Sequence, residues 1–373
     1  MLLAERTPAP ASEPSPGPRR PGVVRGSLGV WLAGLGVALA VSFVVAVAVG
    51  TADISPGQIV GSAWHHAAAA LERVLGGAVS VPANPLSTIQ DAIIWQGRAP
   101  RVVTAAAVGA GLAIAGAVMQ ALMRNPLADP YLLGISSGAT LGAVAVLLLG
   151  VAVLLPVAAF GGALLALALT LALAGATTGS RLTPSRTILA GVAVAQGCAA
   201  VTSFVIFTSA QGDSYREVLS WLMGSLGGAT WLSVAIACGA LAVVGTVLVT
   251  GGRTLDAFAF GDTSATSLGV GVARTRWIGL GLVALLVGAL VSVSGSIGFV
   301  GLVVPHAVRL AVSSRHVRLL PVSAGVGAIV LLWADTLART VIAPRELPVG
   351  ILTAAIGAPV FAVLLLRSRR GAA

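Results

Sequence analysis

The chain has 373 residues, of which 57% are hydrophobic and only 9% are charged, and its formal net charge is +10. An average soluble domain carries about 25% charged residues, so this chain has too few polar side chains to cover a soluble fold of its length. The composition therefore excludes an ordinary water-soluble protein and favours one that is dissolved in lipid.

Apolar stretches follow one another along most of the sequence. Residues 1–26 are Pro-rich, which predicts a disordered tail. A bilayer needs about 20 apolar residues for each spanning helix, and the later stretches predict about ten transmembrane helices. The predicted spans are residues 27–50, 102–123, 132–150, 152–176, 187–208, 229–250, 275–295, 299–313, 319–341 and 349–366. We therefore predict an all-α, polytopic membrane protein with a transmembrane domain over residues 27–368.

The arginines predict the orientation of these spans. All 22 basic residues are arginine, and a cytoplasmic N-terminus would place sixteen of them on the cytoplasmic side and six outside. Basic residues concentrate in cytoplasmic loops of membrane proteins. The pattern therefore predicts that both termini lie in the cytoplasm, and it explains the net charge without nucleic acid.

Little in the sequence points to catalysis. Without a lysine the chain cannot form a lysine-containing phosphate-binding loop. Cys198 and Cys238 lie in apolar stretches and are interpreted as small hydrophobic residues. His65, His66 and His306 lack the converging ligands that a metal site needs. We expect no cofactor, no metal site and no catalytic residues.

Four blocks of sequence, in order, are more specific. They are residues 96–138 (QGRAPRVVTAAAVGAGLAIAGAVMQALMRNPLADPYLLGISSG), residues 260–270 (FGDTSATSLGV), residues 295–309 (GSIGFVGLVVPHAVR), and residues 335–359, which contain ELPVG and GAP. The chain resembles the FecCD family, the membrane-spanning permeases of ABC importers for ferric siderophores, haem and vitamin B12. The resemblance covers about residues 27–368.

This resemblance implies a type II ABC importer permease fold and a set of partners. These are a separate ABC ATPase subunit, an extracytoplasmic solute-binding protein and a second permease subunit, as a homodimer or a heterodimer, in the inner membrane. It implies that residues 252–274 form a cytoplasmic coupling loop that docks on the ATPase. The matching coupling positions are Phe260, Gly261, Asp262, Ala265, Leu268 and Gly269, and the matching positions for docking of the binding protein are Arg98, Arg101 and Arg339.

Two local predictions accompany these assignments. In the coupling loop, Asp262 or Thr263 is expected to cap a short helix, on which Ala265, Leu268 and Val270 form a small apolar face. Asp335 lies in an apolar stretch four residues before Arg339, and this spacing favours an ion pair within one helix.

A ferric siderophore is the substrate that the family resemblance favours first, with cobalamin and haem as alternatives. A secondary transporter driven by an ion gradient is a further alternative, although it would typically need ionisable residues at mid-membrane, and the sequence shows few. An intramembrane enzyme would need a converging polar site, which the sequence does not suggest.

Overall fold

A computed structural model describes residues 27–50, 54–76, 80–176, 183–209, 212–342 and 345–370, and the predicted N-terminal tail lies outside this part of the chain. The described regular elements are all helical. In chain order they are α1 (Leu28–Ala48), α2 (Pro56–Leu75), α3 (Thr88–Ala92), η1 (Ile93–Arg98), α4 (Ala99–Leu122), η2 (Pro130–Leu133), α5 (Ile135–Leu148), η3 (Ala152–Leu154), α6 (Leu155–Ala176), α7 (Pro184–Ser209), α8 (Asp213–Leu222), α9 (Trp231–Ala240), η4 (Leu241–Gly245), α10 (Thr246–Thr250), α11 (Gly252–Ala257), η5 (Phe258–Phe260), α12 (Asp262–Ser267), α13 (Val272–Ser294), α14 (Val300–Ala311), α15 (His316–Ala338) and α16 (Val349–Arg370).

Each of the ten predicted spans corresponds to a helix or to a continuous run of helices. Among the described residues, seven helical segments are long and apolar enough to cross a bilayer, and three shorter apolar helices accompany them: Ile135–Leu148, Val300–Ala311 and Val349–Val363. The run α9–η4–α10 forms one of the seven, and α3–η1–α4 forms another. The prediction of an all-α membrane protein with about ten spans is confirmed.

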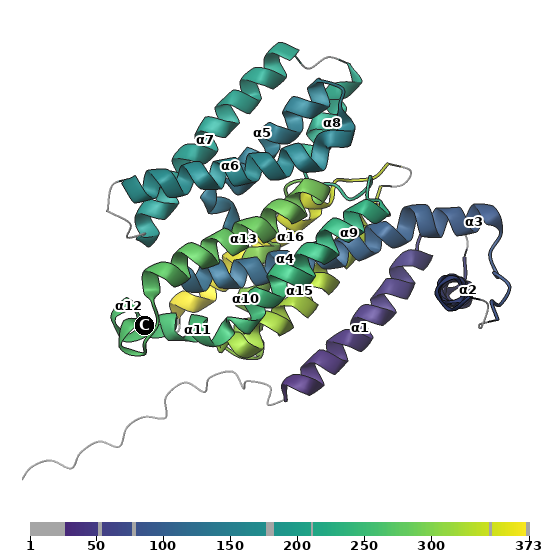
Figure 1. The fold of residues 1–373 in the computed structure, drawn as a ribbon, viewed down its shortest axis with the longest axis horizontal. Helices are drawn as coiled ribbons and strands as arrows, with labels where there is room; N and C mark the ends of the chain where they lie inside the picture. Colours follow the sequence, from purple (N-terminus) through teal and green to yellow (C-terminus); the bar gives the residue numbers. More distant parts are fainter. Residues whose placement is uncertain are drawn as a thin grey trace, which may run out of the picture.

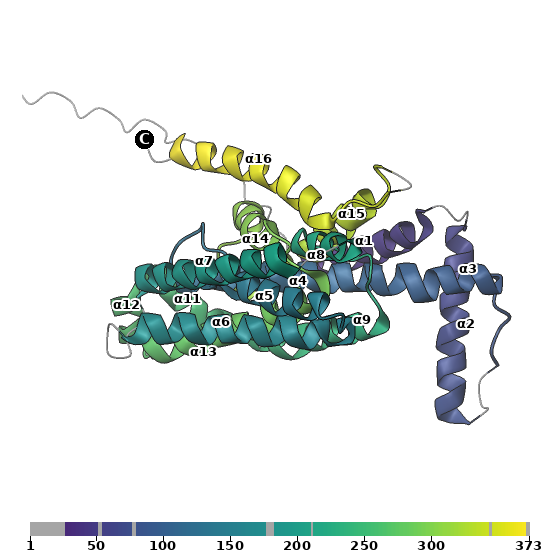
Figure 2. The same ribbon diagram turned by 90° about the horizontal axis from the view of Figure 1, so that it is seen from above.

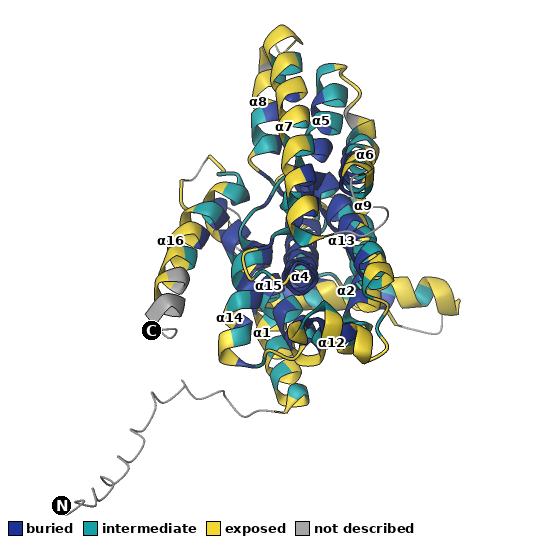
Figure 3. Cartoon of the chain, turned by 90° about the vertical axis from the view of Figure 1, so that its left-hand side faces the viewer, coloured by how far each residue is buried: buried dark blue, intermediate teal, exposed yellow. Residues whose placement is uncertain are grey.

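The centre of the molecule is α4. All its residues except Val103 and Ala106 are buried, and α13, α14, α15 and α9 pack around it. Figure 3 shows this contrast, with a dark buried core around α4 and exposed surfaces on the peripheral helices. Helices α5, α6 and α7 pack against one another as a separate layer, at the top of Figure 1.

Helices α4 and α15 approach each other unusually closely. A Cβ atom added at Gly109 of α4 would collide with the main chain of Gly327 in α15, and the reverse substitution would collide with Gly109. Small residues at such a crossing let two backbones touch, which is how helices associate tightly in lipid. This glycine pair therefore fixes α4 tightly against α15.

The eighth predicted span is a short helix that follows the irregular segment 295–299. Helix α14 has 12 residues, contains Pro305, and follows Phe299, whose φ of 69° is left-handed. Tyr131 stabilises this irregular segment, since its hydroxyl donates to the carbonyl of Ile297 at 2.9 Å and accepts from the Ile297 amide at 3.1 Å. The irregular backbone is thus packed against protein, which is the condition under which lipid-embedded chains tolerate it.

Helix α2 was not predicted. It lies across the end of the bundle opposite α11 and α12, is seen almost end-on in Figure 1, and runs crosswise to α4 in Figure 2. The end that carries α11 and α12 is called the coupling end below, and the opposite one is called the α2 end.

Candidate functional site

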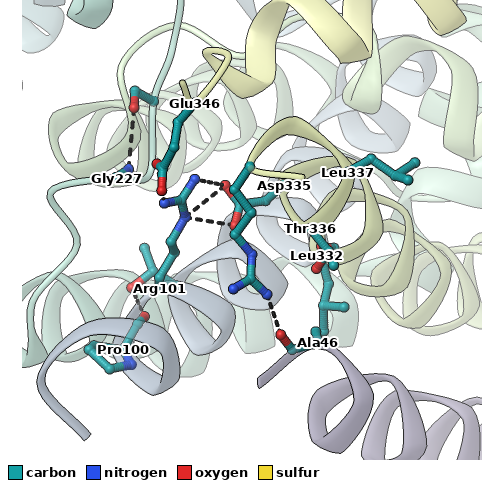
Figure 4. A network of polar contacts seen from close by, with 12 residues as sticks. Ala46, Pro100, Arg101, Gly227, Leu332, Asp335, Thr336, Leu337 and Glu346 are labelled. Carbon is teal, nitrogen blue, oxygen red and sulfur yellow. Dashed lines mark hydrogen bonds and ion pairs between the residues drawn. The ribbon is translucent and has the colours of Figure 1, made fainter. Parts of the chain in front are cut away.

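The α2 end holds a network of buried charges centred on Arg101, near the start of α4 (Figure 4). The Arg101 guanidinium donates three hydrogen bonds to the carboxylate of Asp335 in α15, at 2.8, 2.9 and 3.1 Å. Its remaining Nη1 lies 2.6 Å from Glu346 Oε2, in the segment before α16. The Asp335 side chain is 1% exposed and that of Arg101 9%, whereas Glu346 is 52% exposed. One arginine therefore ties α4 to α15 and to the approach to α16.

The other two predicted docking arginines bind the end of α1. Arg98 donates to the carbonyl of Val47 at 2.9 Å and to that of Ala48 at 3.2 Å. Arg339 donates to the carbonyl of Val49 at 3.0 Å and to that of Ala46. The last carbonyls of a helix have no partner within it and carry partial negative charge. The two arginines therefore cap the C-terminus of α1 and attach it to η1 and α15.

The predicted ion pair between Asp335 and Arg339 is wrong. The cation that pairs with Asp335 is Arg101, 234 residues away in sequence. Arg339 ends α15 in a position from which its side chain reaches the α1 carbonyls instead. The spacing argument identified a buried acid in need of a partner but could not see the neighbouring helix.

The structure brings Arg98, Arg101 and Arg339 to the same end of the molecule, where each guanidinium has partners within the chain. The role of these residues in docking a binding protein stays a prediction. Sequence reasoning assigned no role to Glu346, the exposed acid of the network. Its place in the ELPVG block was the only available signal.

The predicted coupling loop is helical. Helices α11, η5 and α12 form compact turns at the coupling end, and α12 lies between Gly261 (φ 93°) and Gly269 (φ 82°). These φ values are ones that only glycine adopts readily. The two predicted glycine positions therefore shape the chain on either side of α12.

Asp262 fixes α12 to the rest of the protein. Its carboxylate lies 3.1 Å from Arg276 Nη2 of α13 and 3.7 Å from Arg124 Nε. Arg276 is itself buried, donates to the carbonyl of Leu122 at the end of α4, and lies 5.6 Å from the ring of Phe258. The short helices are thus attached directly to two core spans.

Two details of the predicted loop are wrong. The N-cap position of α12 is Gly261, and Asp262 lies in the first helical turn, so neither Asp262 nor Thr263 caps the helix. Ala265 is on the buried side of α12, so the predicted apolar face of Ala265, Leu268 and Val270 is not a single exposed surface. The apolar side chains that face outward are instead Phe260, 76% exposed, and Leu268, 68% exposed.

A second link at the coupling end was not predicted. Asp256 of α11 accepts a hydrogen bond from the main-chain N–H of His316 at 2.7 Å, and the same carboxylate oxygen lies 2.8 Å from the His316 ring Nδ1. The acid thus caps the first turn of α15. As a result, α15 is attached to α11 at one end and to Arg101 at the other.

The histidines at the α2 end also have partners. His66 Nε2 lies 3.0 Å from the carboxylate of Asp91, and His65 Nδ1 lies 2.6 Å from the carbonyl of Pro82. Among the described residues, no three His, Cys, Asp or Glu side chains gather in a way that could hold a metal ion.

Comparison with known proteins identifies the family. The model of the FecCD transport family matches residues 38–367. The chain is 40% identical over 340 residues to YvrB of Bacillus subtilis (strain 168), described as an uncharacterised ABC transporter permease protein, and the match covers 89% of this chain and 92% of that one. It is 47% identical over 275 residues to the cobalamin import system permease protein BtuC of Halobacterium salinarum, covering 73% of this chain and 72% of the relative. Over 343 residues it is 38% identical to the vitamin B12 import system permease protein BtuC of Klebsiella pneumoniae, covering 91% and 94%.

A solved structure has the same fold. It is described as an inward-facing conformation of a metal-chelate type ABC transporter, and it matches with a TM-score of 0.75 at 31% identity, covering 91% of this chain and 99% of the other. The likeness therefore extends over nearly the whole chain. The chain belongs to the FecCD transport family.

Proposed function

We propose that this chain is the permease subunit of an ATP-driven importer that carries a metal chelate across the inner membrane. The family match over residues 38–367 is the observation on which this proposal rests. The ATPase would be a separate subunit, and a second permease, either another copy or a sister chain, would complete the pathway. Both termini would lie in the cytoplasm, as the arginine distribution indicates.

The ATPase would dock at the coupling end. Phe260 and Leu268 project there from short helices, and exposed apolar side chains of this kind suit a cleft on a partner. Asp262 and Arg276 attach the same helices to α13 and to the end of α4. A push on α12 would therefore reach the core as a rigid-body displacement.

The solute-binding protein would dock at the α2 end, near Arg98, Arg101 and Arg339. Their positive charges lie close together, and complementary charge at an interface favours orientation and rate of encounter. Because each guanidinium has internal partners, an acidic residue of the binding protein would share or replace those contacts. Replacing Arg98 with Gln is expected to weaken binding of the partner more at low salt than at high salt, whereas a purely structural role would give no salt dependence.

Two kinds of metal chelate are the leading substrates. The sequence favoured a ferric siderophore, and the relatives named as cobalamin or vitamin B12 permeases, at 38–47% identity, favour a corrinoid. Both are bulky metal chelates, so one pathway could suit either. We propose a metal chelate as the substrate class, with cobalamin tested first beside the siderophore and haem.

Uptake by reconstituted vesicles tests the proposal. The permease, its ATPase and its binding protein would be placed in proteoliposomes and offered labelled cobalamin, iron–siderophore or haem, with a catalytically dead ATPase as the matched control. ATP-dependent entry of one ligand is expected. Entry that continues with the dead ATPase, and that collapses with the ion gradient, would instead identify a secondary transporter.

A further inference from the structure

Helix α2 has well-defined ends and a fixed direction. Ser55 and Gln58 form a reciprocal capping box at its start, and Gly76 ends it in the left-handed conformation at φ 63°. The helix runs crosswise to α4 and lies close to the end of α1 (Figures 1 and 2). Since α1 and α4 are spans, α2 runs parallel to the plane of the membrane, at the level where these spans leave it.

Three polar side chains of α2 contact the neighbouring segments of the protein. The Ser62 hydroxyl donates to Asp91 at 2.8 Å and accepts from the indole N–H of Trp95 at 2.9 Å. His66 also contacts Asp91, and the neighbouring His65 contacts the carbonyl of Pro82. These contacts hold α2 against α3, η1 and the preceding segment.

The opposite face of α2 is apolar and exposed. Its large side chains recur at helical spacing, so they form one stripe, and each is between 48% and 80% exposed. The members of this stripe are Val60, Trp64, Leu71, Val74 and Leu75. A helix on a water-soluble surface shows the reverse arrangement, with its apolar face inward.

The lipid-facing surface of α1 indicates what covers this stripe. Helix α1 is a span that is mostly exposed and presents apolar side chains such as Val30, Val37 and Val41 along its length. Helix α2, which carries the stripe, contacts α1. The stripe contains no charged side chain, and its one polar group, the Trp64 indole N–H, suits the boundary between acyl chains and headgroups, where tryptophan is enriched. A docking face for a soluble protein would be expected to carry charged groups at its rim.

We propose that α2 is an interfacial helix, whose stripe inserts into the lipid at the α2 end of the bundle while its polar face anchors α3 and η1. An amphipathic helix of this kind lies in the interface with its apolar side buried at the boundary of headgroups and acyl chains. Because η1 carries Arg98 and leads directly into Arg101, the lipid surface would set the height of the arginine network. The proposal depends only on the membrane-spanning fold and not on the identity of the substrate.

Site-directed labelling of the full chain tests this proposal. Cys198 and Cys238 are first replaced by Ala, and single cysteines are then introduced as Trp64→Cys and Leu71→Cys. Arg73→Cys, at an exposed position outside the stripe, is the matched control. Each variant is labelled with an environment-sensitive fluorophore and reconstituted in phosphatidylcholine vesicles, with or without lipid that carries a nitroxide near the headgroup.

The stripe positions are expected to show blue-shifted emission and strong quenching by the nitroxide lipid, and the Arg73 position is expected to show neither. Equal, water-like emission at all three positions would overturn the proposal. Emission that is blue-shifted but unquenched by the lipid, with disulfide crosslinking between chains at Leu71→Cys, would also overturn it, because a second copy of this chain would then cover the stripe.

Discussion

Removing Asp335, the buried partner of Arg101, should lower the free energy of unfolding far more than removing Glu346, its exposed partner. In Asp335→Ala, a guanidinium that is 9% exposed loses three of its hydrogen bonds and keeps only the half-exposed Glu346. Removing one partner of a buried pair costs about 3–5 kcal/mol. Because Glu346 still offers one carboxylate oxygen, we expect a loss near the lower end, about 3 kcal/mol in the free energy of unfolding. Glu346→Gln removes a solvent-screened contact and should cost about 0–1 kcal/mol.

The measurement is denaturant-induced unfolding of the purified permease in detergent micelles, followed by tryptophan fluorescence. A double variant, Arg101→Leu with Asp335→Leu, is the matched control, because replacing both charges with apolar groups avoids an unpaired buried charge and is often close to neutral. The double variant should therefore be more stable than Asp335→Ala alone. A loss below about 1 kcal/mol in Asp335→Ala would refute the reasoning, since it would place the pair in the class of exposed salt bridges.

Three further predictions concern other parts of the molecule. Phe260→Ala and Leu268→Ala should abolish ATP-driven uptake in proteoliposomes while changing the free energy of unfolding by less than about 0.5 kcal/mol, as exposed substitutions do; normal uptake by both would contradict the coupling role. Gly327→Leu should lower the yield of folded protein in size-exclusion chromatography, since overpacking costs about 1–3 kcal/mol or more, whereas Gly281→Ala, where a Cβ meets no neighbour, should leave it unchanged. The protein packed around the carboxyl of Asp129 raises its pKa to about 6, above the usual value of about 3.9. The folded state therefore binds this proton first as the pH falls, so thermal stability should rise between pH 7 and pH 4, and Asp129→Asn should reduce that rise; an identical pH profile in both proteins would contradict the assignment.

The spans could be predicted because a single physical requirement defines them. A helix that crosses the hydrocarbon needs a long apolar stretch, and each predicted stretch corresponds to a helix or to a run of helices, including the short α14. Helix α2 was missed for the opposite reason. Its sequence is less apolar than that of a span, because a serine and two histidines lie among its alanines. Only its contacts with Asp91 and Trp95 show which face is inward.

The partners of the charged residues were harder to predict than the residues themselves. Asp335 stood out as an acid in an apolar stretch, but Arg101 lies 234 residues away, and local spacing pointed to Arg339. Likewise, the coupling block singled out Asp262, but its attachment to Arg276 depends on the fold. The sequence therefore singled out the charged residues, and tertiary packing determined which partner each of them has.

The double attachment of α15 limits how the transporter can move. This helix has 23 residues and is roughly 34 Å long. His316 is held to α11 at one end, Asp335 is held to α4 at the other, and Gly327 touches α4 between them. If α15 slid along α4, a larger side chain would enter the contact between Gly109 and Gly327. We therefore expect the two helices to move together as one rigid body. A change in the width of a pathway beside them would then come from other helices, and a displacement at the coupling end would be transmitted along α15 to the α2 end.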